Sequence, residues 1–404
     1  MSFDVRTVAD LDEFDQAFLS IGQYFGAEPD EERAEKWSRV LPFDRALAAT
    51  EDGAVVGGAG AFPFTMTVPG GTVRCAGVTI VGVYPTHRRR GALSAMMRKQ
   101  LDNVRESGEP IAALWASEER IYTRYGYGLA SLCGETKLLH AHGSYALPFE
   151  PHGRVRIVGR DEAAKLLPSV YERWQPQSPG AFGRSEAWWE TRVLDDPPDR
   201  RQGRGPKRFA VVERDGEPTA YAIYRHAPKF EGMVSRSTLV VVEAVGADAG
   251  ALATIWRYLL DVDWSETIEG YLLPVDHPLF LLLAEPRRLR YLVGDGLWVR
   301  LVDVGAALSQ RGYAADGAVV FDVADEFLPD NAGRWKLEDG SAARTDDEPD
   351  IRLDVRDLGS VYLGGFTFAE LQRSLRIQEL RDGAIARADA IFRSDIHPWC
   401  PEIF

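Results

Sequence analysis

Three consecutive arginines and a glycine, Arg88 to Gly91, follow an apolar, β-branched run that begins at Val78. The run predicts a buried strand, and Pro85 must end it because proline lacks the N–H that a strand ladder needs. Apolar residues then recur at helical spacing from Leu93 to Val104. Unpaired N–H groups of a first helical turn, together with the helix dipole, attract anions. The strand, basic turn and helix therefore predict a phosphate site.

A tyrosine-rich motif, Ala-Ser-Glu-x-x-Ile-Tyr-x-Arg-Tyr-Gly-Tyr-Gly, spans Ala116 to Gly128. A phenol is protonated at neutral pH and can give its proton to a departing thiolate. Tyr122 and Tyr125 lie one helical step apart, so spacing alone makes either of them a candidate proton donor. Tyrosines stacked in the core are the alternative explanation.

The string Val-x-Pro-Thr-His-Arg-Arg-Arg-Gly, Val83 to Gly91, together with the tyrosine motif, resembles the enhanced intracellular survival (Eis) family of acetyl-CoA-dependent acetyltransferases. The turn is also similar to the pyrophosphate loop of GNAT N-acetyltransferases, Gln/Arg-x-x-Gly-x-Gly/Ala, although Leu93 stands where a small residue is usual. The resemblance implies an α/β (α+β) fold with two GNAT-like lobes in tandem and a C-terminal sterol-carrier-like domain. We expect a catalytic lobe over residues 1–147, a second lobe without a cofactor loop over 148–295, and the sterol-carrier-like domain over 296–404.

Acetyl transfer from a thioester requires that the diphosphate of acetyl-CoA be held and that the thioester carbonyl be polarised. The helix start would hold the diphosphate, with Arg89 and Arg90 as charged partners. A bulge near Val81 to Val83 would free a backbone N–H for the oxyanion, and pantetheine would lie beside that strand where the strand 111–115 splays away. The predicted cofactor-binding residues are Val81, Gly82, Val83, Arg89, Arg90, Gly91, Ala92, Leu93, Ser94, Ser117 and Glu118.

The resemblance assigns the general acid to Tyr122 and the general base to the carboxylate of the last residue, Phe404. A terminal carboxylate is ionised at neutral pH and can take a proton from an ammonium group. Pro398 and Pro401 stiffen the end of the chain, which is not the composition of a frayed tail. Glu402 is a rival base, and a tail that docks only for stability is the alternative.

The acceptor site is expected to include Phe25, Trp37, Ile80 and Glu402, and Trp37 resembles a family aromatic. We expect direct transfer in a ternary complex, since no candidate nucleophile accompanies the motifs. The seven histidines lie apart and there is no Cys-x-x-Cys, so no metal is expected.

The net charge of −14 argues against a nucleic acid partner and favours a cationic acceptor, such as an aminoglycoside or another polycationic amine. A protein-lysine acetyltransferase is the enzyme alternative. A lipid-binding or assembly protein with relic acetyltransferase lobes is the non-enzyme alternative. The resemblance implies a homo-oligomer, with hexamers expected.

The chain of 404 residues is long enough for two or three domains. Its longest apolar patches are core-sized, which predicts no membrane span, and the N-terminus lacks a signal-peptide layout. Three cysteines are too few for a disulfide framework and indicate a reducing, cytoplasmic compartment.

Local patterns also predict individual elements. In the first lobe we expect helical stretches over 5–25 and 31–40, strands over 46–50, 54–64, 66–68, 73–83 and 111–115, and a short helix capped by Ser117 that ends at Gly126. In the second lobe we expect strands over 207–213, 220–226, 238–245 and 270–273, and helices over 249–260 and 277–284. In the third domain we expect strands over 297–304, 317–323, 333–338, 342–345 and 351–355, and helices over 357–363 and 383–392.

Overall fold

The computed structural model describes residues 3–404, which divide into two compact units. Unit 1 contains the chain up to Ser131, Leu297–Asp395 and Ile403–Phe404, and unit 2 contains Leu132–Gly296 and Ile396–Glu402. Unit 1 comprises a first lobe and a C-terminal domain, which begins at Val304. We call unit 2 the second lobe.

The first lobe is built on one seven-stranded sheet in the order β1-β2-β3-β4-β5-β16-β6. Neighbouring strands are antiparallel except β4 and β5, which are parallel. The strands are β1 Asp4–Thr7, β2 Ala46–Glu51, β3 Ala54–Val68, β4 Gly71–Val83, β5 Ile111–Trp115, β6 Gly128–Leu129 and β16 Leu297–Leu301. The helices are α1 Leu11–Gly22, α2 Glu31–Ser38, α3 Ala92–Glu106 and α4 Glu119–Tyr122.

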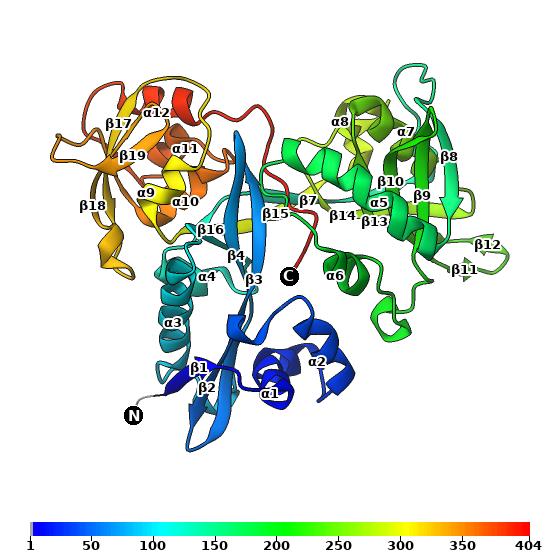
Figure 1. The fold of residues 1–404 in the computed structure, drawn as a ribbon. Helices are drawn as coiled ribbons and strands as arrows, with labels where there is room; N and C mark the ends of the chain where they lie inside the picture. Colours follow the sequence, from blue (N-terminus) through cyan, green and yellow to red (C-terminus); the bar gives the residue numbers. More distant parts are fainter. Residues whose placement is uncertain (1–2) are drawn as a thin grey trace. The chain divides into compact units, whose positions relative to one another are not determined.

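Helices α1 and α3 cover opposite faces of this sheet (Figure 1). A Cβ added at Gly57 would meet Met96 of α3, whereas a Cβ added at the next residue, Gly58, would meet the backbone of Ala17 in α1. Successive residues of a strand point to opposite faces, so glycines here allow both helices to approach the sheet closely.

The structure confirms the predicted strands over 46–50 and 73–83 and the predicted helix after the arginines, and it joins the strands expected over 54–64 and 66–68 into the single strand β3. Two local predictions are wrong. The helix expected from residue 5 begins only at Leu11, because Asp4–Thr7 pairs with β2 as an edge strand. Ser117 does not cap α4, since the N-cap residue is Glu118 and Ser117 bonds to the Tyr122 side chain instead.

Strand pairing divides the chain differently from the predicted domain boundaries. Residues 297–304 were expected to open the third domain, but β16 pairs with β5 and β6 in the sheet of the first lobe. Strand β7, Leu132–Leu139, was expected in the catalytic lobe, but it pairs with β14 and β15 in the second lobe. The two sheets thus divide the chain after Ser131 and again before Leu297, and not after residue 147.

The C-terminal domain has a five-stranded sheet in the order β19-β18-β17-β20-β21. The buried rings of Phe321, Phe368 and Phe392 pack against one another inside this domain, with centroids 5.0–6.0 Å apart. The strands are β17 Ala318–Ala324, β18 Gly333–Glu338, β19 Ser341–Arg344, β20 Ile351–Asp354 and β21 Gln378–Glu379. The helices are α9 Val304–Ser309, α10 Val355–Tyr362, α11 Phe368–Arg373 and α12 Ala384–Phe392.

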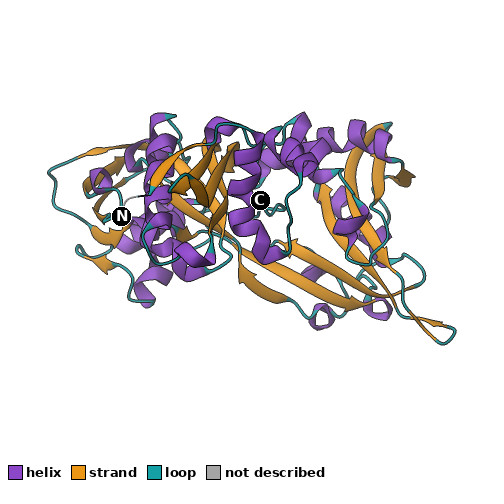
Figure 2. Cartoon of the chain, turned by 90° about the horizontal axis from the view of Figure 1, so that it is seen from below, coloured by secondary structure: helices purple, strands orange, loops and turns teal. Residues whose placement is uncertain are grey.

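The second lobe also has a seven-stranded sheet, in the order β15-β7-β14-β13-β10-β9-β8. In addition to β7, its strands are β8 Arg154–Val158, β9 Arg208–Arg214, β10 Glu217–Ala227, β13 Ser237–Gly246, β14 Ser265–Leu273 and β15 Leu292–Asp295. The helices are α5 Arg160–Trp174, α6 Glu186–Trp188, α7 Ala249–Leu260 and α8 Leu279–Leu282. A small hairpin, β11 Phe230–Glu231 and β12 Val234–Ser235, extends from the sheet at the lower right of Figure 2.

Two predictions in this lobe had the right type but the wrong length. The strand expected over 270–273 extends back to Ser265, and the helix expected over 277–284 is limited to Leu279–Leu282.

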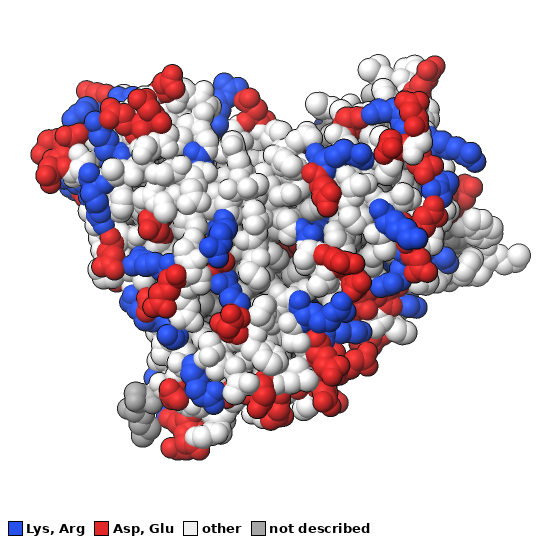
Figure 3. Space-filling view, viewed as in Figure 1, with Lys and Arg blue, Asp and Glu red and all other residues white. Residues whose placement is uncertain are grey.

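Charged side chains of both signs are interspersed over the face shown in Figure 3. Across residues 3–404, every helix falls short of the length and apolar character that a membrane crossing requires.

Candidate active site

Strands β4 and β5 of the first lobe pair over a short stretch and then separate, and we call the diverging edges of these two strands the cleft. The two strands pair only from Cys75 to Gly77 on β4, opposite Ile111 to Ala113 on β5. Beyond Gly77, β4 continues to Val83 beside β3, while β5 pairs with β16 on its other side. The backbone of β4 from Val78 onward therefore has a free edge toward the cleft, which is the place expected for pantetheine.

Strand β4 bulges at this free edge. Ile80 and Val81 together stand opposite the single residue Ala59, because Thr79 pairs with Gly60 and Gly82 pairs with Gly58. Ile80 has φ +48, a left-handed conformation that costs a β-branched residue about 1–3 kcal/mol. The bulge expected near Val81 to Val83 is thus present, and strain is stored at the candidate site.

The turn after β4 leaves the N-terminus of α3 open. Gly91 is the N-cap residue with φ +98, and since it has no side chain it cannot cap the N–H groups of the first turn, Ala92 to Ser94. An uncapped helix N-terminus is a ready site for a phosphate. The observed backbone therefore fits the diphosphate of acetyl-CoA.

The three arginines of the turn have different surroundings. Arg88 lies over the ring of Tyr24, 4.7 Å from its centroid. Arg90 is paired with Glu51. Arg89 is exposed and has φ +62. Leu93, beside the turn, is half-buried, and Ser94 is exposed.

Two tyrosines of the motif contact different parts of the first lobe. The Tyr122 hydroxyl is hydrogen-bonded to the Ser117 side chain, just beyond the end of β5. The Tyr125 hydroxyl lies 3.2 Å from Oγ of Ser94, in the first turn of α3. Burial raises the pKa of Tyr122 to about 12, so this hydroxyl keeps its proton at neutral pH.

The two glycines of the motif are required by close packing. Gly126 has φ +83, and a Cβ added there would lie 2.2 Å from Nη1 of Arg300. A Cβ added at Gly128 would lie 1.8 Å from the carbonyl oxygen of Arg356 in α10. Arg300 is fully buried and its Nη2 bonds to Asp325 at 2.6 Å. Sequence reasoning missed Arg300, although a lone charge inside the apolar run 297–302 was a usable signal.

Replacing Gly126 with alanine is expected to destabilise the protein by about 2–4 kcal/mol, because the strained conformation and the clash with Arg300 add together. Gly53→Ala is the matched control, since Gly53 has φ +78 but nothing within 4 Å of an added Cβ. It should cost only about 1–2 kcal/mol. Urea unfolding of both variants measures the difference, and equal losses would show that the Arg300 contact is unimportant.

The last residue packs beside the cleft. The ring of Phe404 lies 5.3 Å from that of Phe64 and 6.3 Å from that of Phe62, both on β3. A Cβ added at Gly77 would lie 3.3 Å from Cε2 of Phe404. Gly77 is the last β4 residue that pairs with β5. The C-terminus of the chain is therefore docked at the point where the cleft opens.

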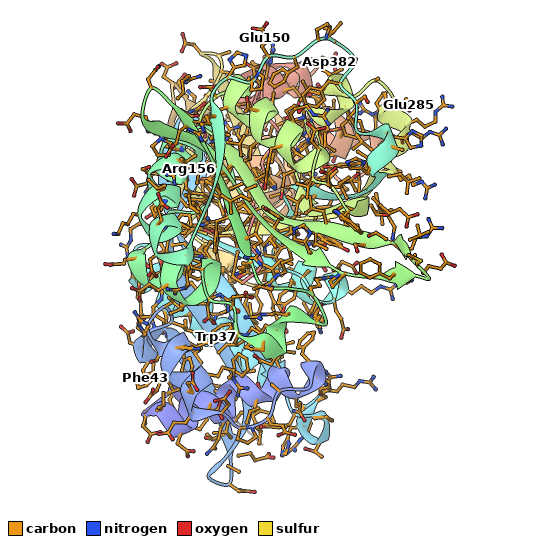
Figure 4. All side chains as sticks on the ribbon, turned by 90° about the vertical axis from the view of Figure 1, so that its right-hand side faces the viewer. Trp37, Phe43, Glu150, Arg156, Glu285 and Asp382 are labelled. Atoms are coloured by element: carbon orange, nitrogen blue, oxygen red, sulfur yellow. The ribbon has the colours of Figure 1, made fainter. Side chains whose placement is uncertain are left out.

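The residues predicted for the acceptor site lie in different surroundings. The Trp37 ring lies 5.8 Å from that of Phe62, which joins it to the aromatic group around Phe404. Figure 4 shows Trp37 on the N-terminal, blue part of the ribbon. Ile80 is buried, and Phe25 is 76% exposed, more than a pocket wall should be.

Glu402 belongs to the second lobe and is buried in an ion pair with Arg184. Burial raises the pKa of this carboxyl. Its role as a rival base remains a prediction, as do the roles of the other predicted site residues.

Within residues 3–404, histidine, cysteine, aspartate and glutamate side chains form no group of three or more that could hold a metal ion.

Comparisons with known families agree with this architecture. Residues 4–130 and residues 180–301 each match an acetyltransferase (GNAT) domain, and residues 304–401 match a sterol carrier protein domain. The fold and the sequence thus define a GNAT N-acetyltransferase with two GNAT domains and a C-terminal sterol-carrier-type domain.

Relatives that match most or all of the chain identify the family within this class. An uncharacterized N-acetyltransferase of Streptomyces avermitilis is 41% identical over the whole of both chains. The N-acetyltransferase Eis of Mycobacterium tuberculosis is 34% identical over 90% of each chain. The crystal structure of Eis1 from Mycobacterium abscessus superposes with a TM-score of 0.86 at 32% identity, covering 99% of this chain and 100% of that one. The chain belongs to the Eis family of GNAT N-acetyltransferases.

Proposed function

We propose that the enzyme transfers the acetyl group of acetyl-CoA directly to a primary amine of a small polycationic acceptor, such as an aminoglycoside. The observation that carries the proposal is the docking of Phe404 beside Gly77, at the mouth of the cleft between β4 and β5. On this proposal the Phe404 carboxylate, the bulged strand β4 and the buried Tyr122 would act as one site in the first lobe.

The donor would be held by the backbone N–H groups of Ala92, Leu93 and Ser94, with Arg89 and Arg90 supplying positive charge. Backbone N–H groups of Val81, Gly82 and Val83 would stabilise negative charge on the thioester oxygen. Ser117 and Glu118, both exposed after β5, would line the exit of the cleft.

Tyr122 is the better placed acid of the two tyrosines. Its partner Ser117 follows β5, on the side where the thioester would lie, whereas Tyr125 reaches the phosphate end of α3. A buried phenol with a raised pKa stays protonated and can donate to the departing thiolate.

The Phe404 carboxylate would take a proton from the acceptor ammonium group, directly or through water. The neutral amine then attacks the carbonyl carbon and a C–N bond forms. As the C–S bond breaks, Tyr122 protonates the sulfur, the nitrogen loses its second proton to water, and water later returns a proton to Tyr122. The aromatic contacts of Phe404 with Phe62 and Phe64 support this role, because they fix the residue that bears the carboxylate.

A polycationic acceptor suits a chain with a net charge of −14, since opposite charge accelerates encounter. A lysine side chain of a protein is the second candidate acceptor. A lipid-binding role is less well supported, because three phenylalanine rings pack against one another inside the C-terminal domain. We further propose that the enzyme is a homo-oligomer, a hexamer by analogy with its family.

Thiol release from acetyl-CoA tests the proposal. N-terminally tagged protein is mixed with aminoglycosides, polyamines or a lysine peptide, and free thiol is measured over time. Release that depends on a small polycationic amine is the expected result. Release only with the lysine peptide would favour the second candidate, and folded protein that releases no thiol with any amine would overturn the transferase.

A further inference from the structure

The second lobe repeats the cleft architecture of the first. Its strand order β8-β9-β10-β13-β14-β7-β15 corresponds, strand by strand, to β1-β2-β3-β4-β5-β16-β6. Strand β13 carries one extra residue, Val242, because Ile223 pairs with Glu243 and Tyr224 pairs with Val241. The parallel pairing of β13 with β14 ends at Val241. This lobe therefore has its own bulged strand and diverging neighbour.

Residues 396–402 bind at this place in the second lobe. The Trp399 indole N–H donates to the carbonyl of Leu272 on β14, and the Trp399 backbone N–H donates to Pro179 at 2.7 Å. The Trp399 ring also packs against Trp174, with centroids 5.0 Å apart. Glu402 is joined through Arg184 to Glu243 of β13. The segment thus contacts β14 directly and β13 through Arg184.

Arg184 is the centre of this contact. Its side chain is 1% exposed, its Nε donates to Glu402, and its Nη1 donates to Glu243 at 3.0 Å. The Tyr221 hydroxyl donates to Glu243, and the guanidinium lies 3.8 Å from the centroid of the Tyr171 ring. A buried guanidinium that bridges two carboxyl groups is a specific contact, because its donors have a fixed geometry.

The helix that follows β13 does not provide a phosphate site. Its N-cap is Asp248, whose carboxylate accepts from the N–H of Ala251 at 2.8 Å, whereas α3 of the first lobe begins at Gly91. The Ala251 N–H, followed by Arg214, keeps the pKa of Asp248 below its usual range, so the carboxylate is ionised and would repel a phosphate. The second cleft is suited to a peptide rather than to a coenzyme.

We propose that the cleft of the second lobe is the docking site for residues 396–402, and that Arg184 is a positioning residue of the enzyme. By holding Glu402, Arg184 restricts the two residues that follow it, Ile403 and Phe404. The inference rests on the proposed function, in which the Phe404 carboxylate is the base. On this proposal, turnover in the first lobe also requires Arg184, a residue of the second lobe that does not touch the reacting atoms.

The test compares Arg184→Met and Glu402→Gln with wild type. Lys165→Met, at an exposed position of α5, is the control for losing a positive charge from the same lobe. Amide hydrogen exchange of the peptide 396–404 is measured in the full-length protein by mass spectrometry, with kcat, the KM for acetyl-CoA and Tm. Glu402→Gln keeps the shape of the carboxylate, so it remains informative if Arg184→Met folds poorly.

Faster exchange of the 396–404 amides, by about 10-fold or more, is expected in both variants and not in the control. We expect kcat to fall by about 10²-fold in Arg184→Met while the KM for acetyl-CoA stays within about 3-fold, because the carboxylate loses its position and the cofactor cleft is unchanged. Faster exchange and lower kcat count as support only in variants whose Tm shows that they are folded.

Unchanged exchange in the two variants would overturn the docking role of Arg184. Faster exchange with full turnover would overturn its positioning role. Failure of the proposed function is seen separately, as wild-type protein that acetylates no amine, because hydrogen exchange needs no turnover to be read.

Discussion

Replacing Tyr122 with phenylalanine is expected to lower kcat by about 10²-fold or more, the usual contribution of a general acid. The KM for acetyl-CoA should stay within about 2-fold, since the ring and its packing against Tyr127 are kept. Burial raises the pKa of Tyr122 to about 12, and the acid is active only while protonated. Its activity is lost as the pH rises through that value, so it causes no fall in wild-type kcat below about pH 11.

Tyr125→Phe is the matched control, because Tyr125 is a buried neighbour in the same core cluster. It loses the contact with Ser94 and should cost far less in kcat than Tyr122→Phe. Steady-state kinetics on both variants decide the assignment. If Tyr122→Phe keeps wild-type turnover, Tyr122 is not the acid, and a larger loss in Tyr125→Phe would transfer the role.

Two glycines added after Phe404 are expected to reduce kcat by about 10²-fold or more, because they turn the terminal carboxylate into an amide that cannot accept a proton. The same two glycines at the N-terminus should have no effect. Phe62 and Phe64 hold the ring of Phe404 beside Gly77, so an extension also forces new chain into the mouth of the cleft. Thiol release with the best acceptor measures both proteins.

Phe404→Ala separates the carboxylate from the ring. This variant keeps the terminal carboxylate but loses its aromatic contacts, so its turnover should lie between that of wild type and that of the extended protein. Equal activity of the C-terminally and N-terminally extended proteins would remove the terminal carboxylate from the mechanism.

Local patterns were sufficient for much of the first lobe. The apolar run of β4 and the helical spacing of α3 predicted both elements to within two residues, because each buries a regular face. The turn between β4 and α3 was also predicted at its observed position, and with it the uncapped N-terminus of α3. The bulge was also expected near its observed position at Ile80 and Val81.

Contacts between distant parts of the chain could not be predicted, because no local sequence pattern marks them. Strand β16 is a short apolar run buried on both faces, and nothing in it specifies that it pairs with β5 rather than within the C-terminal domain. Arg184 is an ordinary arginine in the sequence, and only the fold brings it to Glu402. Strand β1 was missed because its four residues form an edge strand with little burial.

The placement of β16 has a consequence for synthesis. Strand β5 needs β16 as its antiparallel neighbour, yet the ribosome makes β16 roughly 180 residues later, about 10–40 s at ordinary elongation rates. During that interval the sheet of unit 1 has an unpaired edge at β5, whereas residues 132–296 of unit 2 emerge without interruption. Unit 2 can therefore form first and unit 1 must close after it. Nascent chains stalled before residue 297 should consequently be protease-resistant in unit 2 and sensitive in unit 1.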